Sequence, residues 1–258
     1  MAGHTRNHSQ PAVVSDMVSN LSFHALVPGR ATYEQPPIKT IKYDPHKTYV
    51  SIMSSDGDNV GFSMGALPSD LSFDKSFPMS WTISNHLADF APFALRWCYD
   101  RASETTLDSF LMGPSGYGYL EPNNNPNHRW FARRTIDAAR ELDMVAVVDW
   151  EKGEQEPERI DRIIEYLDTY WRAGSPIKAV FSTSNSRLPH YLQGRPMFRE
   201  YYRWEPKDGK PALSAQEMAN RLNARALRGK LVHVYRLYNV SMTQIAEMVS
   251  LLDGHVEV

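Results

Sequence analysis

From Tyr49 to the C-terminus, short apolar and β-branched runs alternate with longer amphipathic runs. Runs of the first kind are typical of buried strands, and runs of the second kind are typical of helices that cover them. Strands that alternate with helices pair in parallel through right-handed crossovers. We therefore expect an α/β fold, a closed or distorted (β/α) barrel with mostly parallel strands, with an open doubly wound sheet as the alternative.

Eight strands and five helices are expected along this stretch. The strand candidates are 49–53, 79–83, 109–112, 144–149, 177–182, 198–203, 231–237 and 255–258. The helix candidates are 85–102, 128–142, 157–173, 215–227 and 243–252. In a barrel or a doubly wound sheet, ligands bind beyond the C-terminal ends of the strands. Candidate functional residues are therefore sought in the loops that follow the strands.

The 258 residues are expected to form one α/β domain behind an N-terminal arm. This length fits one domain with a sizeable core better than two small ones. Residues 1–45 contain five prolines and no sustained periodicity, so we interpret them as an arm with one short helix near 12–21. The predicted domain is residues 46–258.

Composition argues against nucleic acid and membrane partners. The chain carries 28 basic and 30 acidic residues, a formal charge of −2, and so lacks the electrostatic footprint of a polyanion binder. The sequence has no run of about 18 apolar residues that would predict a membrane-spanning helix. The polar N-terminus lacks the apolar core of a secretory signal. The single cysteine, Cys98, excludes a disulfide within the chain and is expected to be a buried apolar residue.

The sequence GPSGYGYLEP, residues 113–122, follows the predicted strand 109–112. Glycines at a strand end let the backbone adopt positive φ or approach a ligand closely. Tyr117 and Tyr119 offer flat rings with hydroxyl groups, which suit contacts with sugars. A dinucleotide-binding loop would need glycine in place of Glu121, and a serine-hydrolase elbow would need glycine in place of Tyr117. The loop is a candidate sugar site or, alternatively, a glycine-rich turn whose tyrosines cover the core.

A second candidate is the turn SSDGDN, directly after the first predicted strand. Asp56, Asp58 and Asn59 carry groups that bind a divalent cation, position a sugar hydroxyl, or act as catalytic acid and base. An EF-hand is excluded because Val60 and Leu67 stand where that loop needs oxygen ligands. The alternative is structural, with Asp58 or Asn59 capping the helix that follows. We expect no cofactor other than a divalent cation at Asp56 and Asp58.

A third group of candidates follows the strand 144–149. Asp149, Trp150 and Glu151 place two acids and a large ring where a barrel would open. Glycosidases use two carboxyl groups, one that protonates the leaving oxygen and one that attacks or activates water. Sequence does not give the separation of such groups, so retaining and inverting mechanisms both stay open. A solvated loop with ordinary surface charge is the alternative interpretation.

Two further candidates lie on later strands. His233 alternates with apolar neighbours and is expected to share a face with Leu231 and Tyr235, either as a buried structural histidine or as a substrate contact. Arg203 ends the sixth predicted strand and either contributes a guanidinium to the site or lies on an exposed loop. The motifs His-Glu-x-x-His and Cys-x-x-Cys are absent from the sequence, which disfavours a zinc deacetylase.

The glycine and tyrosine loop resembles the signature of the GxGYxYP family of putative glycoside hydrolases. In the segment GYGYLEP, residues 116–122, the departure from the family is Glu121, where the family has tyrosine. Further segments are similar to the family in the same order over roughly 45–258, namely 49–59, 78–83, 87–92, 194–196 and 231–234. The resemblance implies a glycoside hydrolase. It also implies an extracellular or exported protein, although this chain shows no signal peptide.

The sequence thus predicts a glycoside hydrolase that acts on an unidentified glycan by carboxylate acid and base chemistry. The catalytic candidates are Asp56, Asp58, Asp149 and Glu121. The substrate-binding candidates are Asn59, Trp81, Tyr117, Tyr119, Trp150, Glu151, Arg203 and His233. Two alternatives remain, a non-catalytic glycan-binding domain and a metal-dependent carbohydrate esterase or deacetylase. A carbohydrate is the expected partner in each case.

Overall fold

The structure is a computed structural model of the chain. It describes residues 18–37, 41–55, 57–120, 125–149, 164–165, 167–182, 191–192, 195–198, 201–224, 229, 231–237 and 239–258. The helix expected at 12–21 lies mainly outside these residues, and within the helix expected at 157–173 the described residues 164–165 and 167–170 are helical.

Eight parallel strands form a sheet that curls through 276° into a half-barrel. Their order across the sheet is β7-β5-β4-β3-β2-β1-β9-β8. In addition, β6 pairs antiparallel with β7, and β10 pairs parallel with β1. The bounds are β1 Thr48–Ser54, β2 Met79–Ile83, β3 Asp108–Met112, β4 Ala146–Asp149, β5 Ala179–Ser182, β6 Tyr191–Leu192, β7 Arg195–Phe198, β8 Tyr201–Trp204, β9 Leu231–Arg236 and β10 Val256–Glu257.

The strand order is that of a barrel and not of a doubly wound sheet. From β1, the strands β2, β3, β4 and β5 follow one another on one side. On the other side β9 lies next to β1, and β8 lies farther out although it comes earlier in the chain. The late strands β8 and β9 therefore add to the sheet on the side of β1 that is opposite to β2. In a closed barrel the last strand pairs with the first in the same way. The expected distorted barrel is confirmed, and the strand expected at 198–203 is divided between β7 and β8.

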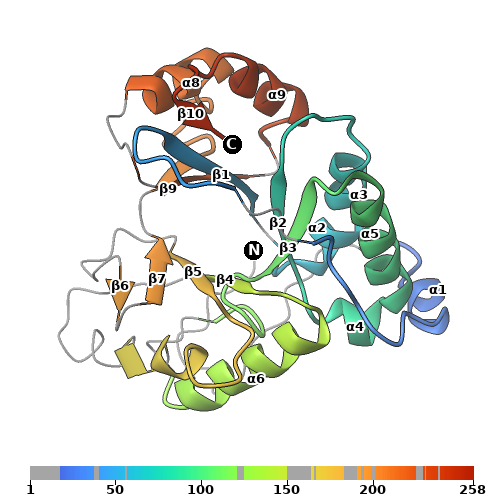
Figure 1. The fold of residues 1–258 in the computed structure, drawn as a ribbon. Coiled ribbons are helices and arrows are strands. Elements are labelled where there is room, and N and C mark those ends of the chain that lie inside the picture. The colour runs from blue at the N-terminus through green and yellow to red at the C-terminus, as the bar shows by residue number, and fades with distance from the viewer. Residues whose placement is uncertain are drawn as a thin grey trace.

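Helices cover the outside of the curled sheet. Figure 1 shows α8 and α9 over β1 and β9, α3 and α5 beside β2 and β3, and α6 under β4 and β5. Within the described residues none of the helices has the length and apolarity that a bilayer span requires. The bounds are α1 Leu21–Leu26, α2 Val60–Met64, α3 Ala66–Leu71, α4 Leu87–Phe90, α5 Pro92–Thr105, α6 His128–Glu141, α8 Ala215–Ala224 and α9 Met242–Ser250.

Two helices, α2 and α3, were not expected from sequence, and one expected helix is divided. Helices of five and six residues are too short to show a 3.6-residue periodicity. The helix predicted over 85–102 is interrupted at Ala91, and α5 begins with Pro92 at its first position. Proline has no backbone N–H to donate inside a helix but is favoured at the first helical position, so it starts a new helix here.

The two faces of the sheet carry two separate cores. Successive residues of a strand point to opposite faces, and in β1 Val50 and Ile52 belong to the large core beneath the helices, whereas Met53 belongs to a smaller core on the concave face. The smaller core consists of Met53, Leu111, Ala146, Val148, Phe181 and Tyr235. Side chains therefore fill the middle of the half-barrel, and ligand chemistry is expected at the strand ends.

The N-terminal arm packs against the barrel through residues 18–37. The side-chain amide of Gln35 donates to the carbonyl oxygen of Phe110 at 3.0 Å and accepts from the Phe110 N–H. β3 pairs with β4 at Met112 and Val147. Gln35 therefore hydrogen-bonds to the backbone of β3 two residues before that pair. A free strand edge is a liability in a folded protein, so this stretch of the arm completes the sheet.

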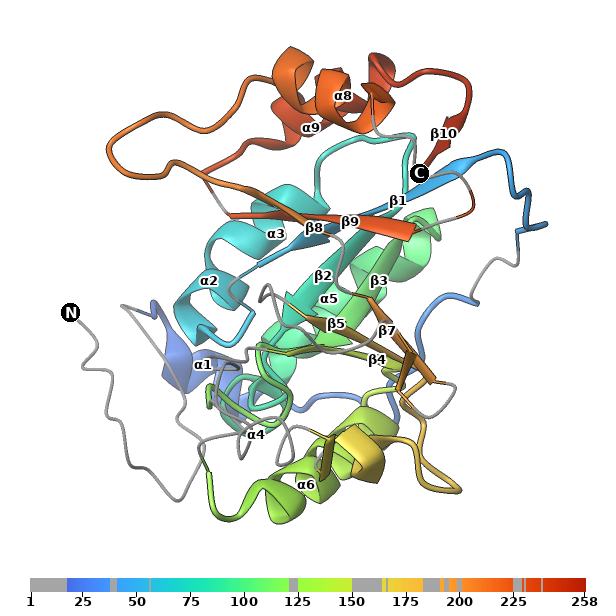
Figure 2. The same ribbon diagram turned by 90° about the vertical axis from the view of Figure 1, so that its left-hand side faces the viewer.

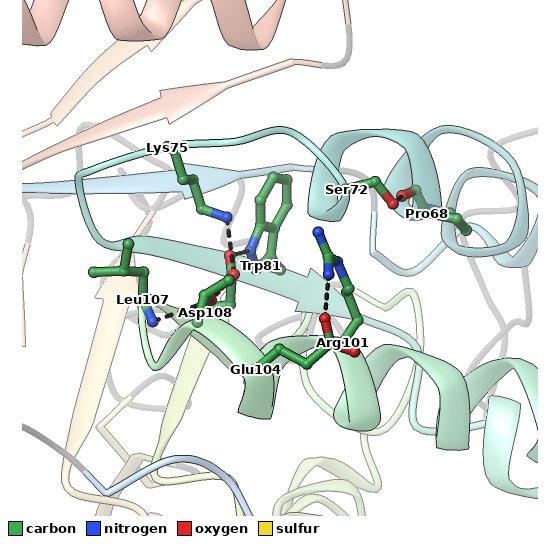
Figure 3. A network of polar contacts seen from close by, with 9 residues as sticks. Pro68, Ser72, Lys75, Trp81, Arg101, Glu104, Leu107 and Asp108 are labelled. Atoms are coloured by element: carbon green, nitrogen blue, oxygen red, sulfur yellow. Dashed lines mark hydrogen bonds and ion pairs between the residues drawn. The ribbon is translucent and has the colours of Figure 1, made fainter.

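A buried ion pair joins β3 to the segment that precedes β2. The Lys75 ammonium lies 2.8 Å from the Asp108 carboxylate, and both side chains are fully buried (Figure 3). Asp108 also accepts from the indole N–H of Trp81 at 2.6 Å and from the Thr105 hydroxyl at 2.9 Å. The buried carboxylate is thus saturated with donors, as a buried charge must be.

Candidate functional site

The residues that follow β1, β2 and β3 are polar and nearly fully buried. Ser55 follows β1 at 1% exposure, Asn85 and His86 follow β2 at 7% and 8%, and Ser115 follows β3 at 0%. Parallel strands bring these C-terminal ends to one edge of the sheet, the edge where α2 and α4 begin (Figure 2). We call residues 55, 57–59, 84–86 and 113–119 together the polar rim.

The acidic turn after β1 is fixed to the neighbouring strand. The Gly57 N–H donates to the Thr82 hydroxyl at 3.0 Å, and that hydroxyl donates to the Ser54 carbonyl at 2.7 Å. A Cβ on Gly57 would lie 2.0 Å from the carbonyl carbon of Thr82, so only glycine fits this close approach. Glycine therefore sets the turn against β2 and places Asp58 on the polar rim.

Asp58 and Asn59 have different positions in this turn. Asn59 is the N-cap of α2, and its side-chain oxygen accepts from the Phe62 N–H at 3.2 Å. The predicted capping role thus belongs to Asn59. Asp58 precedes the cap and is half-buried. Asp58 is accordingly the acid of this turn that the structure describes, next to the residue that caps α2.

The loop after β3 folds back onto α6. Gly113 and Gly116 have φ values of +132° and +108°, which disfavour any residue with a side chain. A Cβ on Gly113 would lie 2.6 Å from the Val148 carbonyl oxygen, and one on Gly116 would lie 2.7 Å from the Thr135 side chain. The Tyr117 N–H donates to the Thr135 hydroxyl at 3.1 Å. Gly113 and the signature glycine Gly116 therefore seat the loop between β4 and α6.

Tyr117 lies between the loop after β2 and the exposed face of α6. Its carbonyl oxygen is 2.7 Å from His86 Nε2, and the two ring centroids are 4.8 Å apart. The Arg134 guanidinium lies 4.8 Å from the Tyr117 ring and donates to its hydroxyl at 3.2 Å. Trp130 meets the ring edge-on at 6.2 Å. Tyr117 is half-buried, so part of its ring stays accessible.

The imidazole of His86 is held in one tautomer. A carbonyl oxygen only accepts, so Nε2 carries the proton that is donated to Tyr117. Burial lowers the pKa of His86, with the hydrogen bond to Tyr117 and the Asp89 charge acting in the opposite direction. A neutral imidazole therefore presents its unprotonated Nδ1 at the polar rim, with the Asp89 carboxylate 3.9 Å away.

We expect the stability of the protein to fall as the pH drops below about 6.5, in part because of His86. Burial lowers the folded-state pKa of His86, so its contribution is complete above the unfolded-state pKa and is lost as the pH falls through the folded-state pKa. Urea unfolding from pH 7.5 to pH 5 should show a shallower pH dependence in His86→Gln than in wild type. His46→Asn, at an exposed histidine, is the control. Equal slopes in wild type and His86→Gln would contradict this assignment.

Asp149 faces the helices and not the concave side of the sheet. It is 0% exposed and shares a strand face with Val147, which belongs to the large core. Burial, and next the Asp149 charge, raise the pKa of Tyr170, which also belongs to that core. The side chain therefore lies between β4 and the helical layer. A catalytic role would require its carboxylate to reach the polar rim from that layer.

Three predicted substrate contacts lie away from the polar rim. Trp81 is 0% exposed in the large core and donates to Asp108, so we leave it out of the proposed site. His233 is also 0% exposed, on the concave side of β9, where it meets the Phe181 ring edge-on at 5.4 Å. Arg203 is exposed on β8 and forms an ion pair with Glu205.

The remaining candidates are Tyr119, which is half-buried on the loop after β3, and four residues that lie outside the described part of the chain, Asp56, Glu121, Trp150 and Glu151. Among the described residues no three His, Cys, Asp or Glu side chains gather as metal ligands would. The described rim thus brings together Asp58, Asn59, Tyr117 and Tyr119.

Sequence reasoning missed the polar residues after β2. Ser84, Asn85 and His86 directly follow a strand, as the acidic turn does, but the interpretation of 85–102 as one helix included Asn85 and His86. The run of three polar residues between Ile83 and the first helical residue was the available signal. It indicates a third polar strand end, next to those of β1 and β3.

Comparison with known proteins gave one family and one solved structure. The model of the GxGYxYP putative glycoside hydrolase C-terminal domain matches residues 46–258. The crystal structure of a putative hydrolase from Bacteroides thetaiotaomicron VPI-5482 superposes with a TM-score of 0.73 at 22% sequence identity. The match covers 93% of this chain and 48% of that one, so this chain spans about half its length. A search of curated proteins found no match.

Proposed function

We propose that this chain, which belongs to the family of GxGYxYP putative glycoside hydrolase C-terminal domains, binds a glycan at the polar rim and hydrolyses a glycosidic bond there. The observation that carries the proposal is that three adjacent strands, β1, β2 and β3, are each followed by buried polar residues on one edge. That edge holds the half-buried Asp58, the neutral His86 and the part-exposed Tyr117. The name of the similar crystal structure, a putative hydrolase, agrees with this proposal.

The reaction requires two carboxyl groups on opposite sides of the scissile bond. One protonates the leaving oxygen, and the other attacks the sugar or activates water. Asp58 is our first choice for one of them because it stands on a turn that is fixed to β2 and does not cap α2. The second carboxyl group is then Asp56 or Glu121, which follow strands in the sequence, or Asp149, which is the last residue of β4. Asn59, Tyr117, Tyr119, Trp150 and Glu151 are the proposed sugar contacts.

A screen of soluble polysaccharides tests the proposal. The full chain is incubated with neutral, acidic and amino-sugar polymers, and new reducing ends are counted over time. We expect the wild type to release reducing ends from at least one polymer. Protein with the Asp58→Asn substitution is the matched control for a contaminating hydrolase. Release that is equal in the two proteins would overturn the proposal.

A non-catalytic glycan-binding domain is the second candidate, and one observation favours it. Phe90 and Trp130 beside the polar rim are 43% and 40% exposed, so each leaves part of an apolar ring face in water. Such rings bind sugars without any chemistry. Retention of a polymer in an affinity gel, without any release of reducing ends, would support this candidate over a hydrolase.

A further inference from the structure

We infer that four rings beside the polar rim form a binding surface for an acidic glycan chain, one that carries uronate carboxylates. The rings are Phe90, His86, Tyr117 and Trp130, which we call the aromatic row. The inference rests on the proposed function, since it names the class of glycan that the site would take. It adds three residues, Phe90, Trp130 and Arg133, that the sequence did not indicate.

The rings of the aromatic row contact one another in sequence. Phe90 stacks on His86 with centroids 6.0 Å apart and planes 26° apart. His86 contacts Tyr117 at 4.8 Å, and Tyr117 meets the edge of Trp130 at 6.2 Å. The four residues come from α4, from the loops after β2 and β3, and from α6. Two of these loops belong to the polar rim, so the row begins where the proposed reaction takes place.

The two ends of the row are exposed while its middle is supported. Phe90 is 43% and Trp130 is 40% exposed, whereas His86 is 8% exposed. An exposed ring leaves an apolar face in water, and covering that face is favourable. The C–H groups of a pyranose ring can cover it while the sugar hydroxyls stay solvated. Because the exposed rings are separated by two others, the row fits a chain of sugars better than a single one.

The helix that carries Trp130 surrounds it with arginines. Arg129, Arg133 and Arg134 are all exposed on α6, and the first turn of this helix contains no acidic residue. Positive charge near a helix N-terminus opposes the helix dipole, so helix stability does not account for this arrangement. Arginine binds carboxylates through two parallel hydrogen bonds.

These arginines differ in how their charge is matched. Arg129 pairs with Glu165, and Arg134 holds the Tyr117 hydroxyl and lies 3.9 Å from Asp137. Within the described part of the chain, Arg133 has no carboxylate at ion-pair distance. Asp89, which lies 3.9 Å from His86, adds a carboxylate that also acts on Arg134, so the positive charge left unmatched beside Trp130 is that of Arg133. A glycan with carboxylate groups complements this surface, whereas a neutral or cationic glycan does not.

The test is titration calorimetry of the full chain with oligosaccharides of matched length. The acidic probes are oligogalacturonate, oligomannuronate and hyaluronan fragments, and the neutral probes are cello- and malto-oligosaccharides. We expect at least one acidic probe to bind more tightly than every neutral probe. Trp130→Ala and Phe90→Ala should each weaken that binding about 3- to 10-fold, as loss of one stacked ring predicts. Trp130→Phe should restore most of it.

Charge variants separate stacking from carboxylate recognition. Arg133→Gln should weaken binding of the acidic probe and reduce its salt dependence, because screening acts on exposed charges. Arg221→Gln, the same change at an exposed arginine on α8, should do neither. Three results would each overturn the inference: no binding of any acidic probe, equal binding of acidic and neutral probes, or unchanged binding in Trp130→Ala and Arg133→Gln.

The result can be read separately from that for hydrolysis. If binding depends on Trp130 and Arg133 but no polymer is cleaved, the inference stands and the proposed hydrolysis fails. If a polymer is cleaved at the same rate and KM by wild type, Trp130→Ala and Arg133→Gln, the hydrolysis stands and the inference fails.

Discussion

Replacing Asp58 with asparagine is expected to reduce glycan hydrolysis by a factor of about 100 or more, because general acid and base catalysis commonly contributes 10²- to 10⁴-fold. Asparagine has nearly the same shape as aspartate but neither donates an acidic proton nor acts as a nucleophile. The measurement is the initial rate of reducing-end release at saturating polymer. Asp74→Asn, the same change at an exposed acid before β2, should leave the rate unchanged.

The same variant should fold nearly as well as the wild type. The cap of α2 is the Asn59 side chain, so Asp58→Asn removes no capping hydrogen bond. Asn59→Ala, by contrast, should lower the free energy of unfolding by about 1 kcal/mol. Denaturant unfolding of both variants separates the two roles. An Asp58→Asn protein that is destabilised but fully active would show that Asp58 supports the fold and not the chemistry.

Periodicity and turn residues predicted most of the barrel. The predicted strand 79–83 has the same bounds as β2. The bounds of β1, β3 and β9 each differ from the predicted ones by at most one residue. These strands combine apolar, aromatic and β-branched residues over five to seven positions, which is a recognisable strand signal. The division at β7 and β8 was not predictable, since it depends on which neighbouring strand each half pairs with.

The candidate site was predicted less well than the fold, for a physical reason. Sequence indicates that a residue follows a strand but not which way its side chain points from the final pleat. Asp149 and Trp81 show this, because both point into the layer between sheet and helices. The aromatic row escaped prediction because Phe90 and Trp130 lie on two different helices, and only the fold brings them to the same loop.

The second large effect concerns stability, at the buried pair of Lys75 and Asp108. Asp108→Asn is expected to lower the free energy of unfolding by about 3–5 kcal/mol, because it leaves the Lys75 ammonium buried without a countercharge. Lys75→Met should cost a similar amount, since it leaves the carboxylate with only two neutral donors, Trp81 and Thr105. Urea unfolding measures both through the midpoint and slope of the transition.

Combining the two changes should restore much of the loss, which is how a charge effect differs from a packing effect. In the double variant Lys75→Met with Asp108→Asn no buried charge remains, and the asparagine oxygen still accepts from the Trp81 indole. The coupling between the two sites should therefore be large and favourable, as in a double-mutant cycle across a direct contact.

The nearby pair of Arg101 and Glu104 provides the control (Figure 3). Its side chains are 30% and 58% exposed, so Glu104→Gln should cost no more than about 1 kcal/mol. If Asp108→Asn cost as little as Glu104→Gln, water would have to reach Lys75, and the packing of Trp81 over this pair would not isolate it from solvent.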